Sequence, residues 1–201
     1  NDGLYIDHSK LDLISTAFRE TDQGIFSYFG DVVFDNVSLN NINEDAFSAY
    51  GGGTIEIKNS SIENIDYGDG LGVYNGSLYV SGLAVKNIGF GSALGIYGGN
   101  VIVDNSNFEG GLDAGIELYS GSLDLHDSRL SGFPSGNFVS YGGIAALNRL
   151  EIENTDYGIS VYGGAVILSE SAFKEIFTYA VENYSLNQVD ARQNFWGDSS
   201  G

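Results

Sequence analysis

The repeat that decides the fold can be read in residues 94–108, LGIYGGNVIVDNSNF. Its central feature is a tyrosine followed two residues later by a glycine. This pair recurs at Tyr28, Tyr50, Tyr74, Tyr97, Tyr119, Tyr141 and Tyr162, and Tyr184 continues the series without its glycine. The intervals are 22, 24, 23, 22, 22, 21 and 22 residues. A period this constant indicates one supersecondary unit per interval, each stacked on the next.

Within each unit, apolar residues or serine occur four, six, nine and eleven residues after the tyrosine, and an apolar residue lies three before it. In the quoted unit these positions hold Leu94, Val101, Val103, Ser106 and Phe108. Two-residue alternation predicts short strands. The change of phase between positions six and nine requires a sharp bend. Residues that accept the left-handed conformation occur there: Asn36, Asn59, Gly82, Asn105 and Asp127.

Repeats of this kind stack as coils of a parallel β-helix. The coil pattern resembles right-handed parallel β-helix repeats, the superfold of pectate lyases and of many bacterial surface proteins. The closing residues 194–201, NFWGDSSG, resemble an Asn-Trp-Trp-Gly-x-x-Ser-Gly ending found in β-helix domains of secreted and surface-anchored prokaryotic proteins. We therefore predict an all-β, single-stranded right-handed parallel β-helix of about nine coils of roughly 22 residues. The resemblance implies a secreted or cell-surface location.

The pattern extends to both ends of the sequence. At the start, the template for positions four to eleven is matched by Leu4, Ile6, Ser9 and Leu11, with His8 at the bend. On this interpretation residues 12–23 are a long insertion. At the other end the template, shifted by one residue, is matched by Val189, Ala191, Asn194 and Trp196. Residues 1–201 are therefore expected to form one parallel β-helix domain, cut from a longer chain.

Composition limits the partners. Apolar residues make up 42% of the chain without a long uninterrupted run, so no membrane insertion is expected. The net charge of −19 repels nucleic acid, anionic membranes and, unless cations intervene, acidic polysaccharides. The chain has no cysteine, which excludes disulfides and thiolate metal sites. The expected partners are a polysaccharide, a cell-surface protein, or a second copy paired through an open end or a sheet face.

Catalytic residues are not predicted. Tyr5-Ile6-Asp7-His8 resembles the Trp-Ile-Asp-His stretch of pectate lyases, but those enzymes also need arginine near a proline and calcium-binding aspartates on adjacent coils. Here Pro134 is the only proline and no Arg-x-Pro-x-x-Arg occurs. Asp7 and His8 are interpreted as repeat positions equivalent to Asp104-Asn105. Lys10 and Arg129 are placed in one column five coils apart, and His126 on an outward position before a bend.

One acidic constellation is a candidate metal site. Successive coils place acidic residues in the loop before the first strand of the unit: Asp22, Glu44, Asp45, Asp66 and Asp69. Stacked carboxylates either raise one another's pKa or hold a cation, and the glycines around Asp69 would suit calcium. The alternative is a solvated row of loop charges. Neither interpretation requires a cofactor. The ion that this site could hold is calcium.

The tyrosines are the candidate ligand site. Alternation points them outward, so that Tyr97, Tyr119, Tyr141 and Tyr162 could stack on sugar rings or on one another. A second outward column, five residues after the tyrosines, is unusually apolar and suggests a covering partner. We assign to it Tyr5, Val33, Glu56, Tyr79, Ile102, Asp124, Ala146 and Ile167. Tyr79 is its candidate ligand-binding residue.

Two functions follow as hypotheses. The first is a non-catalytic extracellular β-helix domain, acting as a rigid scaffold or as a recognition surface for carbohydrate or protein. The alternative is a polysaccharide-active enzyme (a lyase, hydrolase or epimerase) of the same superfold, because fold alone selects neither.

Overall fold

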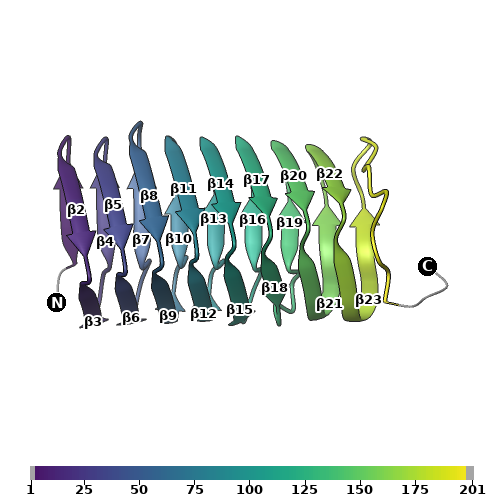
Figure 1. Ribbon diagram of the computed structural model, residues 1–201, viewed down its shortest axis with the longest axis horizontal. Helices are drawn as coiled ribbons and strands as arrows, with labels where there is room; N and C mark the ends of the chain where they lie inside the picture. Colours follow the sequence, from purple (N-terminus) through teal and green to yellow (C-terminus); the bar gives the residue numbers. More distant parts are fainter. Residues whose placement is uncertain (1–2, 198–201) are drawn as a thin grey trace.

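The computed structural model describes residues 3–197, and the chain in this range winds into a straight parallel solenoid (Figure 1). Each coil contributes one strand to each of three faces, and every strand pairs in parallel with its equivalent one coil on. The part of the chain described contains no helix, so none could cross a membrane. The predicted all-β parallel β-helix is confirmed.

Within each coil, the chain passes first through the strand that ends near the tyrosine, then through a middle strand, and then through the strand that closes the coil. These strands form the first, second and third faces. The first contains β1 (Leu4–Asp7), β4 (Ile25–Tyr28), β7 (Phe47–Tyr50), β10 (Leu71–Val73), β13 (Leu94–Ile96), β16 (Ile116–Leu118) and β19 (Phe138–Ser140). The second contains β2 (Lys10–Ile14), β5 (Asp31–Asp35), β8 (Thr54–Lys58), β11 (Ser77–Ser81), β14 (Asn100–Asp104), β17 (Ser122–His126), β20 (Ile144–Asn148) and β22 (Ala165–Ser169). The third contains β3 (Ala17–Thr21), β6 (Ser38–Ile42), β9 (Ser61–Tyr67), β12 (Ala84–Phe90), β15 (Asn107–Gly111) and β18 (Arg129–Ser131).

Two long strands, β21 (Glu151–Val161) and β23 (Ala172–Asn183), begin on the third face and continue onto the first. The eight strands of the second face mark eight coils in the described residues. A partial ninth follows, in which Asp190 bridges to Ile167 and Phe195 to Ala172. Trp196 stacks on Phe173 with ring centroids 4.8 Å apart, which confirms the predicted match at this end. The count agrees with the prediction of about nine coils.

The core lies along the axis and is formed by the template positions. Leu94, Val101, Val103 and Phe108 are at most 1% exposed, and their equivalents in neighbouring coils pack above and below them. The ninth position takes serine because its side chain completes the bend. Ser106 Oγ donates to the carbonyl of Asp104 and accepts the N–H of Leu83 in the preceding coil. A buried hydroxyl is stable when its hydrogen bonds are made.

The bend residues have the predicted left-handed conformation, with φ between 46° and 69° at Asn36, Asn59, Gly82, Asn105 and Asp127. A second left-handed column, which the sequence analysis did not identify, runs through the third face. It includes Asn41, Asn64, Asn87, Gly110 and Asn154. Asn87 Nδ2 donates to Asn64 Oδ1 at 3.1 Å, so amides also link the coils.

The predicted phase of the first coil is wrong. Leu4 pairs with Ile25 and Leu11 with Val32, so Leu4 begins a first-face strand and Leu11 a second-face strand. Residues 12–23 are therefore not an insertion but parts of β2 and β3. The error has a physical cause: this coil has Asp7 where the others have tyrosine, and two-residue alternation fits either strand equally well.

The corrected phase moves three other residues. His8 follows β1 and stacks on Phe29, with ring centroids 5.0 Å apart, instead of occupying the bend after the second strand. Lys10 lies on the second face, so it does not share a column with Arg129. Asp12, not Tyr5, pairs with Val33 and begins the apolar column.

Candidate functional site

The tyrosines form one continuous ladder along the first face. From Tyr28 to Tyr184, each ring stacks on the next with centroids 4.3–5.4 Å apart and planes inclined by 7–17°. Tyr5 extends the ladder beyond Tyr28, with the rings tilted by 33°. The rings therefore stack on one another, and inside the ladder their faces are covered.

The rings fold back over the outer surface of their own sheet. The outward residue at the centre of each first-face strand is small in the middle coils: Ser48, Gly72 and Gly95 are aligned in register. A Cβ atom on Gly95 would lie 3.0 Å from Cε2 of Tyr97. The missing side chains make room for the rings in these coils. Further along the ladder, Tyr119, Tyr141 and Tyr162 are 40%, 46% and 49% exposed.

Beside the ladder lies a chain of hydrogen-bonded carboxylates. Asp69 is only 6% exposed; its Oδ1 accepts the Ser92 N–H at 2.8 Å and its Oδ2 accepts the Tyr97 hydroxyl at 3.1 Å. In the preceding coil, Asp45 Oδ1 accepts the N–H of Asp69 at 2.8 Å and Oδ2 accepts the Ser48 hydroxyl at 2.7 Å. These bonds tie three successive coils together on one side of the tyrosines.

Glu117 continues this chain and was missed by the sequence analysis. Its Oε2 accepts the hydroxyls of Ser92, at 2.5 Å, and of Tyr119, at 3.3 Å. Glu117 occupies the central outward position of β16, where the neighbouring coil has Gly95. The sequence did contain a signal for Glu117: it lies two residues before Tyr119, and alternation along a strand puts both side chains on the same surface.

Burial controls the protonation of these hydrogen-bonded carboxylates and tyrosines. Burial is the main cause that raises the pKa of Asp69 to about 6; the carboxylates of Asp45 and Glu117 add to it, and the hydrogen bonds from Ser92 and Tyr97 oppose it. Burial, followed by the charge of Glu117, raises the pKa of Tyr119 to about 12. The site therefore binds protons more tightly than free carboxyl and phenol groups do.

Of the other acidic residues of the predicted metal site, Asp22 and Glu44 lie in loops and Asp66 lies in β9. Asp22 Oδ1 accepts Asn43 Nδ2 at 2.7 Å, Glu44 Oε2 accepts Gln23 Nε2 at 3.0 Å, and Asp66 is exposed. Of the five, Asp45 and Asp69 join the hydrogen-bonded groups beside the ladder, and each lies two residues before a first-face strand. Within residues 3–197, no three of the five bring ligand atoms within 4.8 Å of one another. Calcium binding here stays a prediction.

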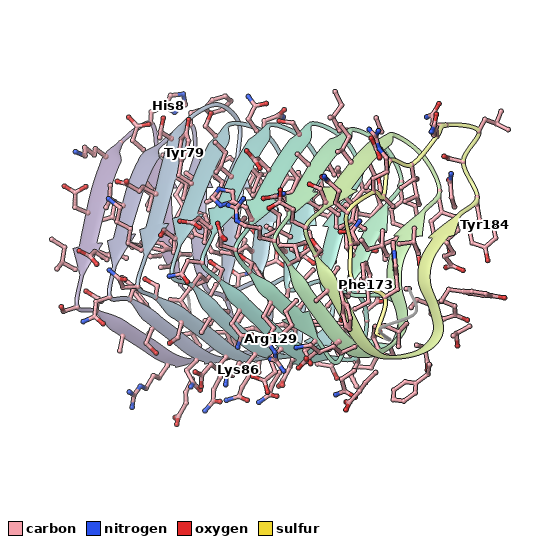
Figure 2. The ribbon with its side chains drawn as sticks, turned by 45° about the vertical axis from the view of Figure 1, so that its right-hand side comes forward. His8, Tyr79, Lys86, Arg129, Phe173 and Tyr184 are labelled. Atoms are coloured by element: carbon pink, nitrogen blue, oxygen red, sulfur yellow. The ribbon has the colours of Figure 1, made fainter. Side chains whose placement is uncertain are left out.

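The second face exposes apolar side chains on a flat sheet. Tyr79, Ile102, Ile144 and Ile167 are 45%, 37%, 61% and 54% exposed. Tyr79 points outward (Figure 2) and lines a shallow hollow that also includes Glu56 and Ile102. Among the described residues, its ring stacks on no other aromatic ring. It therefore differs from the ladder tyrosines in that no aromatic ring covers its face.

The third face carries ion pairs between coils. Lys86 and Arg129 are labelled on this face in Figure 2. Lys86 Nζ lies 3.1 Å from Glu109, and Arg129 Nε donates to Glu153 at 3.0 Å. Lys174 pairs with Glu151 in the same way. Each of these basic side chains is neutralised by a glutamate, so this face does not present a basic surface for acidic sugars.

Comparison with known families gives one match. A family model described as a right handed beta helix region matches residues 2–196. No curated protein and no solved structure matches the chain.

Proposed function

Because the chain belongs to the right-handed β-helix family, we propose that it is a non-catalytic, secreted or cell-surface scaffold that binds a neutral, extended polysaccharide along its second face. The family fold supports a scaffold or a polysaccharide-related domain in general. The observation that carries the finer proposal is the exposure of Tyr79, Ile102, Ile144 and Ile167 on one parallel sheet. Tyr79, Ile102 and Ile167 share one column, interrupted by Asp124 and Ala146, and Ile144 lies in the neighbouring outward column.

Rigidity supports the scaffold part of the proposal. A continuous aliphatic and aromatic core runs from Ile6 to Phe173, and the tyrosine ladder crosses every coil from Tyr28 to Tyr184. In stacked repeats each coil is stabilised by its neighbours, so an unbroken core and ladder give a stiff rod. A stiff rod holds the residues of its faces at fixed spacing and loses little entropy when an extended ligand binds.

The chemistry of the second face favours a neutral sugar chain. Tyr79 offers an exposed ring to the apolar side of a sugar, and the residues aligned around it include Ser77, Asn100 and Ser122, which can hydrogen-bond hydroxyl groups. A net charge of −19 opposes acidic polymers. A cell-surface protein or a second copy of the chain could cover the same apolar residues, and both are outcomes of the experiment below.

The polysaccharide-active enzyme is the alternative, and one observation favours it. Burial and the neighbouring Asp45 and Glu117 raise the pKa of Asp69 to about 6, and a carboxyl group with such a pKa can serve as an acid or base near neutral pH. Asp69 is however 6% exposed beneath the ladder, and both of its oxygens already accept hydrogen bonds. A general acid must reach the substrate oxygen, so this geometry supports a structural role better.

Binding and product release should be measured together, on neutral and acidic polysaccharides, with calcium and with chelator. We expect retention in affinity gels containing a neutral polymer, without new reducing ends or unsaturated products. Tyr79→Thr should weaken retention at least several-fold, because threonine suits the strand but lacks the ring. Tyr67→Thr is the matched control: Tyr67 is 64% exposed on the third face. Circular dichroism checks that both variants fold.

Four results would contradict the proposal. Retention unchanged by Tyr79→Thr, or lost equally in Tyr67→Thr, would exclude the second face as the binding surface. Product release abolished by Asp69→Asn would establish the enzyme instead. A mass that doubles with concentration and returns to that of a monomer in Tyr79→Thr would identify a second copy as the occupant.

A further inference from the structure

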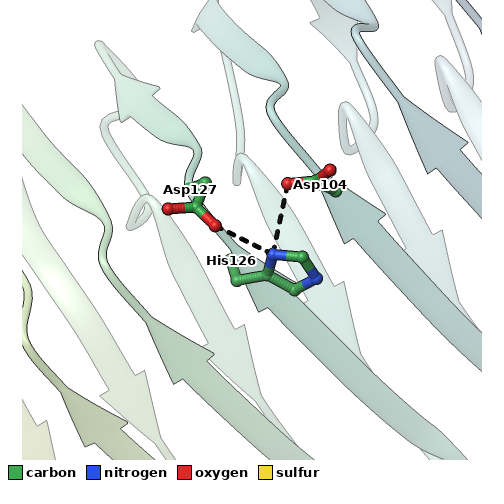
Figure 3. Close-up of side chains that lie close together, drawn as sticks. All are labelled: Asp104, His126 and Asp127. Atoms are coloured by element: carbon green, nitrogen blue, oxygen red, sulfur yellow. Dashed lines mark hydrogen bonds and ion pairs between the residues drawn. The ribbon is translucent and has the colours of Figure 1, made fainter.

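A histidine and two aspartates converge at the edge of the second face (Figure 3). Asp104 ends β14, His126 is its register partner at the end of β17, and Asp127 is the following bend residue. Nδ1 of His126 lies 3.2 Å from Oδ1 of Asp104 and 3.1 Å from Oδ2 of Asp127. All three ligand atoms lie within 4.8 Å of one another. Among residues 3–197 they are the only such group.

We propose that Asp104, His126 and Asp127 bind a divalent transition-metal ion of the zinc type. Imidazole nitrogen together with carboxylate oxygen suits Zn²⁺ and its neighbours, whereas Ca²⁺ and Mg²⁺ prefer oxygen ligands alone. Zinc bonds of about 2.0–2.1 Å in a tetrahedron put neighbouring ligand atoms about 3.3 Å apart. The two nitrogen-to-oxygen distances, 3.2 and 3.1 Å, are close to that separation before any adjustment.

The backbone holds the three side chains in place. Parallel pairing fixes Asp104 beside His126, and the left-handed φ of 52° at Asp127 turns its carboxylate back toward the imidazole. The buried Ser128 hydroxyl donates to the carbonyl of His126 and fixes the bend from inside. Because these contacts belong to the coil itself, the ligand positions are preorganised, which reduces the entropy lost on binding.

The site is open to an ion from the solvent. The side chains of His126, Asp104 and Asp127 are 28%, 42% and 43% exposed. The hollow around Tyr79 borders Asp104 and His126, and leaves space for a water molecule as the fourth ligand. Lys58, which also lines this hollow, has its ammonium group 2.7 Å from Glu56, so its charge is balanced.

Arg149 is the competing cation. Its Nε donates to Asp127 Oδ1 at 2.6 Å and its terminal nitrogen to Oδ2 at 2.5 Å. These two bonds and the contact with Nδ1 of His126 engage both oxygens of the Asp127 carboxylate. A metal on Oδ2 would displace one of the two Arg149 contacts and leave the other to orient Asp127. The guanidinium therefore weakens metal binding without blocking it.

The test uses Zn²⁺ alone, titrated calorimetrically into the chelator-treated full chain. We expect one ion per chain and no displacement by excess Ca²⁺. His126→Asn should weaken binding by tenfold or more, and asparagine fits because Asn148 occupies the next position of the same column. His8→Asn is the matched control: His8 is the only other histidine, and among the acidic residues of 3–197 it pairs with Asp7 alone. It should bind Zn²⁺ as the unmodified chain does.

A third variant tests the competition. Asparagine suits position 149, because Asn105 has the same left-handed conformation at the equivalent bend. Arg149→Asn should tighten Zn²⁺ binding several-fold. Bound Co²⁺ should give a tetrahedral visible spectrum that disappears in His126→Asn. Equal affinity of His126→Asn and the unmodified chain, loss of binding in His8→Asn, or displacement of Zn²⁺ by Ca²⁺ would each overturn the proposal. Unfolding temperatures measured without metal separate loss of ligands from loss of the fold.

Discussion

The hydroxyl group of Tyr97 donates a hydrogen bond to Oδ2 of Asp69, 3.1 Å away, and so joins the tyrosine ladder to a carboxyl group that is 6% exposed. The two residues come from successive coils and are 28 positions apart in the sequence. Burial raises the pKa of both groups, and the nearby carboxylate of Asp69 raises that of Tyr97 further. The ladder is therefore coupled to the protonation of one buried acid.

The first prediction concerns the pH dependence of stability. The folded pKa of Asp69, about 6, lies above the ordinary value of 3.8, so the folded state binds this proton more tightly. The free energy of unfolding should therefore fall as pH rises from about 4 to about 6, by about 2–3 kcal/mol in total from this group. Asp69→Asn should flatten this slope and raise the unfolding temperature at neutral pH. Denaturant unfolding across this pH range measures both effects.

Asp66→Asn is the control for that prediction, because it removes an equal charge from an exposed position near the end of β9, three residues before Asp69. It should leave the pH slope unchanged. Equal flattening by both variants would show that overall charge, not the buried carboxyl group, controls the pH dependence.

The second prediction separates ring stacking from hydrogen bonding in the ladder. Tyr97→Phe keeps both stacking partners and loses the bond to Asp69, so it should destabilise by about 1 kcal/mol. Tyr97→Ala removes the ring between Tyr74 and Tyr119 and should destabilise by about 2–4 kcal/mol. Tyr184→Ala, at the 65% exposed end of the ladder, should have a smaller effect. Equal losses at Tyr97 and Tyr184 would contradict a cooperative ladder; urea unfolding provides the measurement.

The third prediction concerns alkaline pH. Burial is the main cause that raises the pKa of Tyr97 above its usual range and that of Tyr119 to about 12. Unfolded tyrosines ionise near pH 10, so the folded state retains protons that the unfolded state has lost. Stability should therefore decline as pH rises above about 10. Tyrosinate absorbance and circular dichroism should change together where the phenols of Tyr97 and Tyr119 ionise on unfolding. Ionisation of most ladder tyrosines in the intact fold would contradict this expectation.

Much of the fold could be predicted from the sequence because it repeats. Leu94, Val101 and Phe108 keep the same inward positions in each coil, and the left-handed bend at Asn105 accounts for the change of phase between strands. The first coil was misplaced because it has Asp7 at the tyrosine position. Without that marker, alternation alone does not distinguish one strand of a coil from another.

The sites were less predictable, because they depend on outward side chains from different coils. Asp69 and Tyr97 were both candidates, but as members of separate sites. Their hydrogen bond depends on how far the ring of Tyr97 folds back over Gly95, which no repeat pattern specifies. His126 was interpreted as a lone surface residue. It meets Asp104 only because parallel register aligns these residues, which are 22 positions apart.

The fourth prediction uses two aligned glycines that have different surroundings. Gly72 and Gly95 are register partners on the outer surface of the first face. A Cβ atom on Gly95 would lie 2.4 Å from Asp69 Oδ2 and 3.0 Å from Tyr97 Cε2, so Gly95→Ala must displace the carboxyl group or the ring. The same atom on Gly72 would lie 3.4 Å from both Ser48 Oγ and Tyr74 Cε2, which the neighbours can absorb with small shifts.

We therefore expect Gly95→Ala to destabilise the protein by about 1–3 kcal/mol, as overpacking does, and Gly72→Ala to change stability by less than about 1 kcal/mol. Because the clash falls on the bond between Asp69 and Tyr97, Gly95→Ala should also alter the pH slope between about 4 and 6, whereas Gly72→Ala should not. Denaturant unfolding of the two variants at pH 4 and pH 7 measures both effects. If Gly95→Ala and Gly72→Ala change stability and pH slope alike, the two glycines have no specific part in the contact between Asp69 and Tyr97. If only Gly95→Ala changes them, Gly95 is required for the contact that couples the ladder to the buried acid.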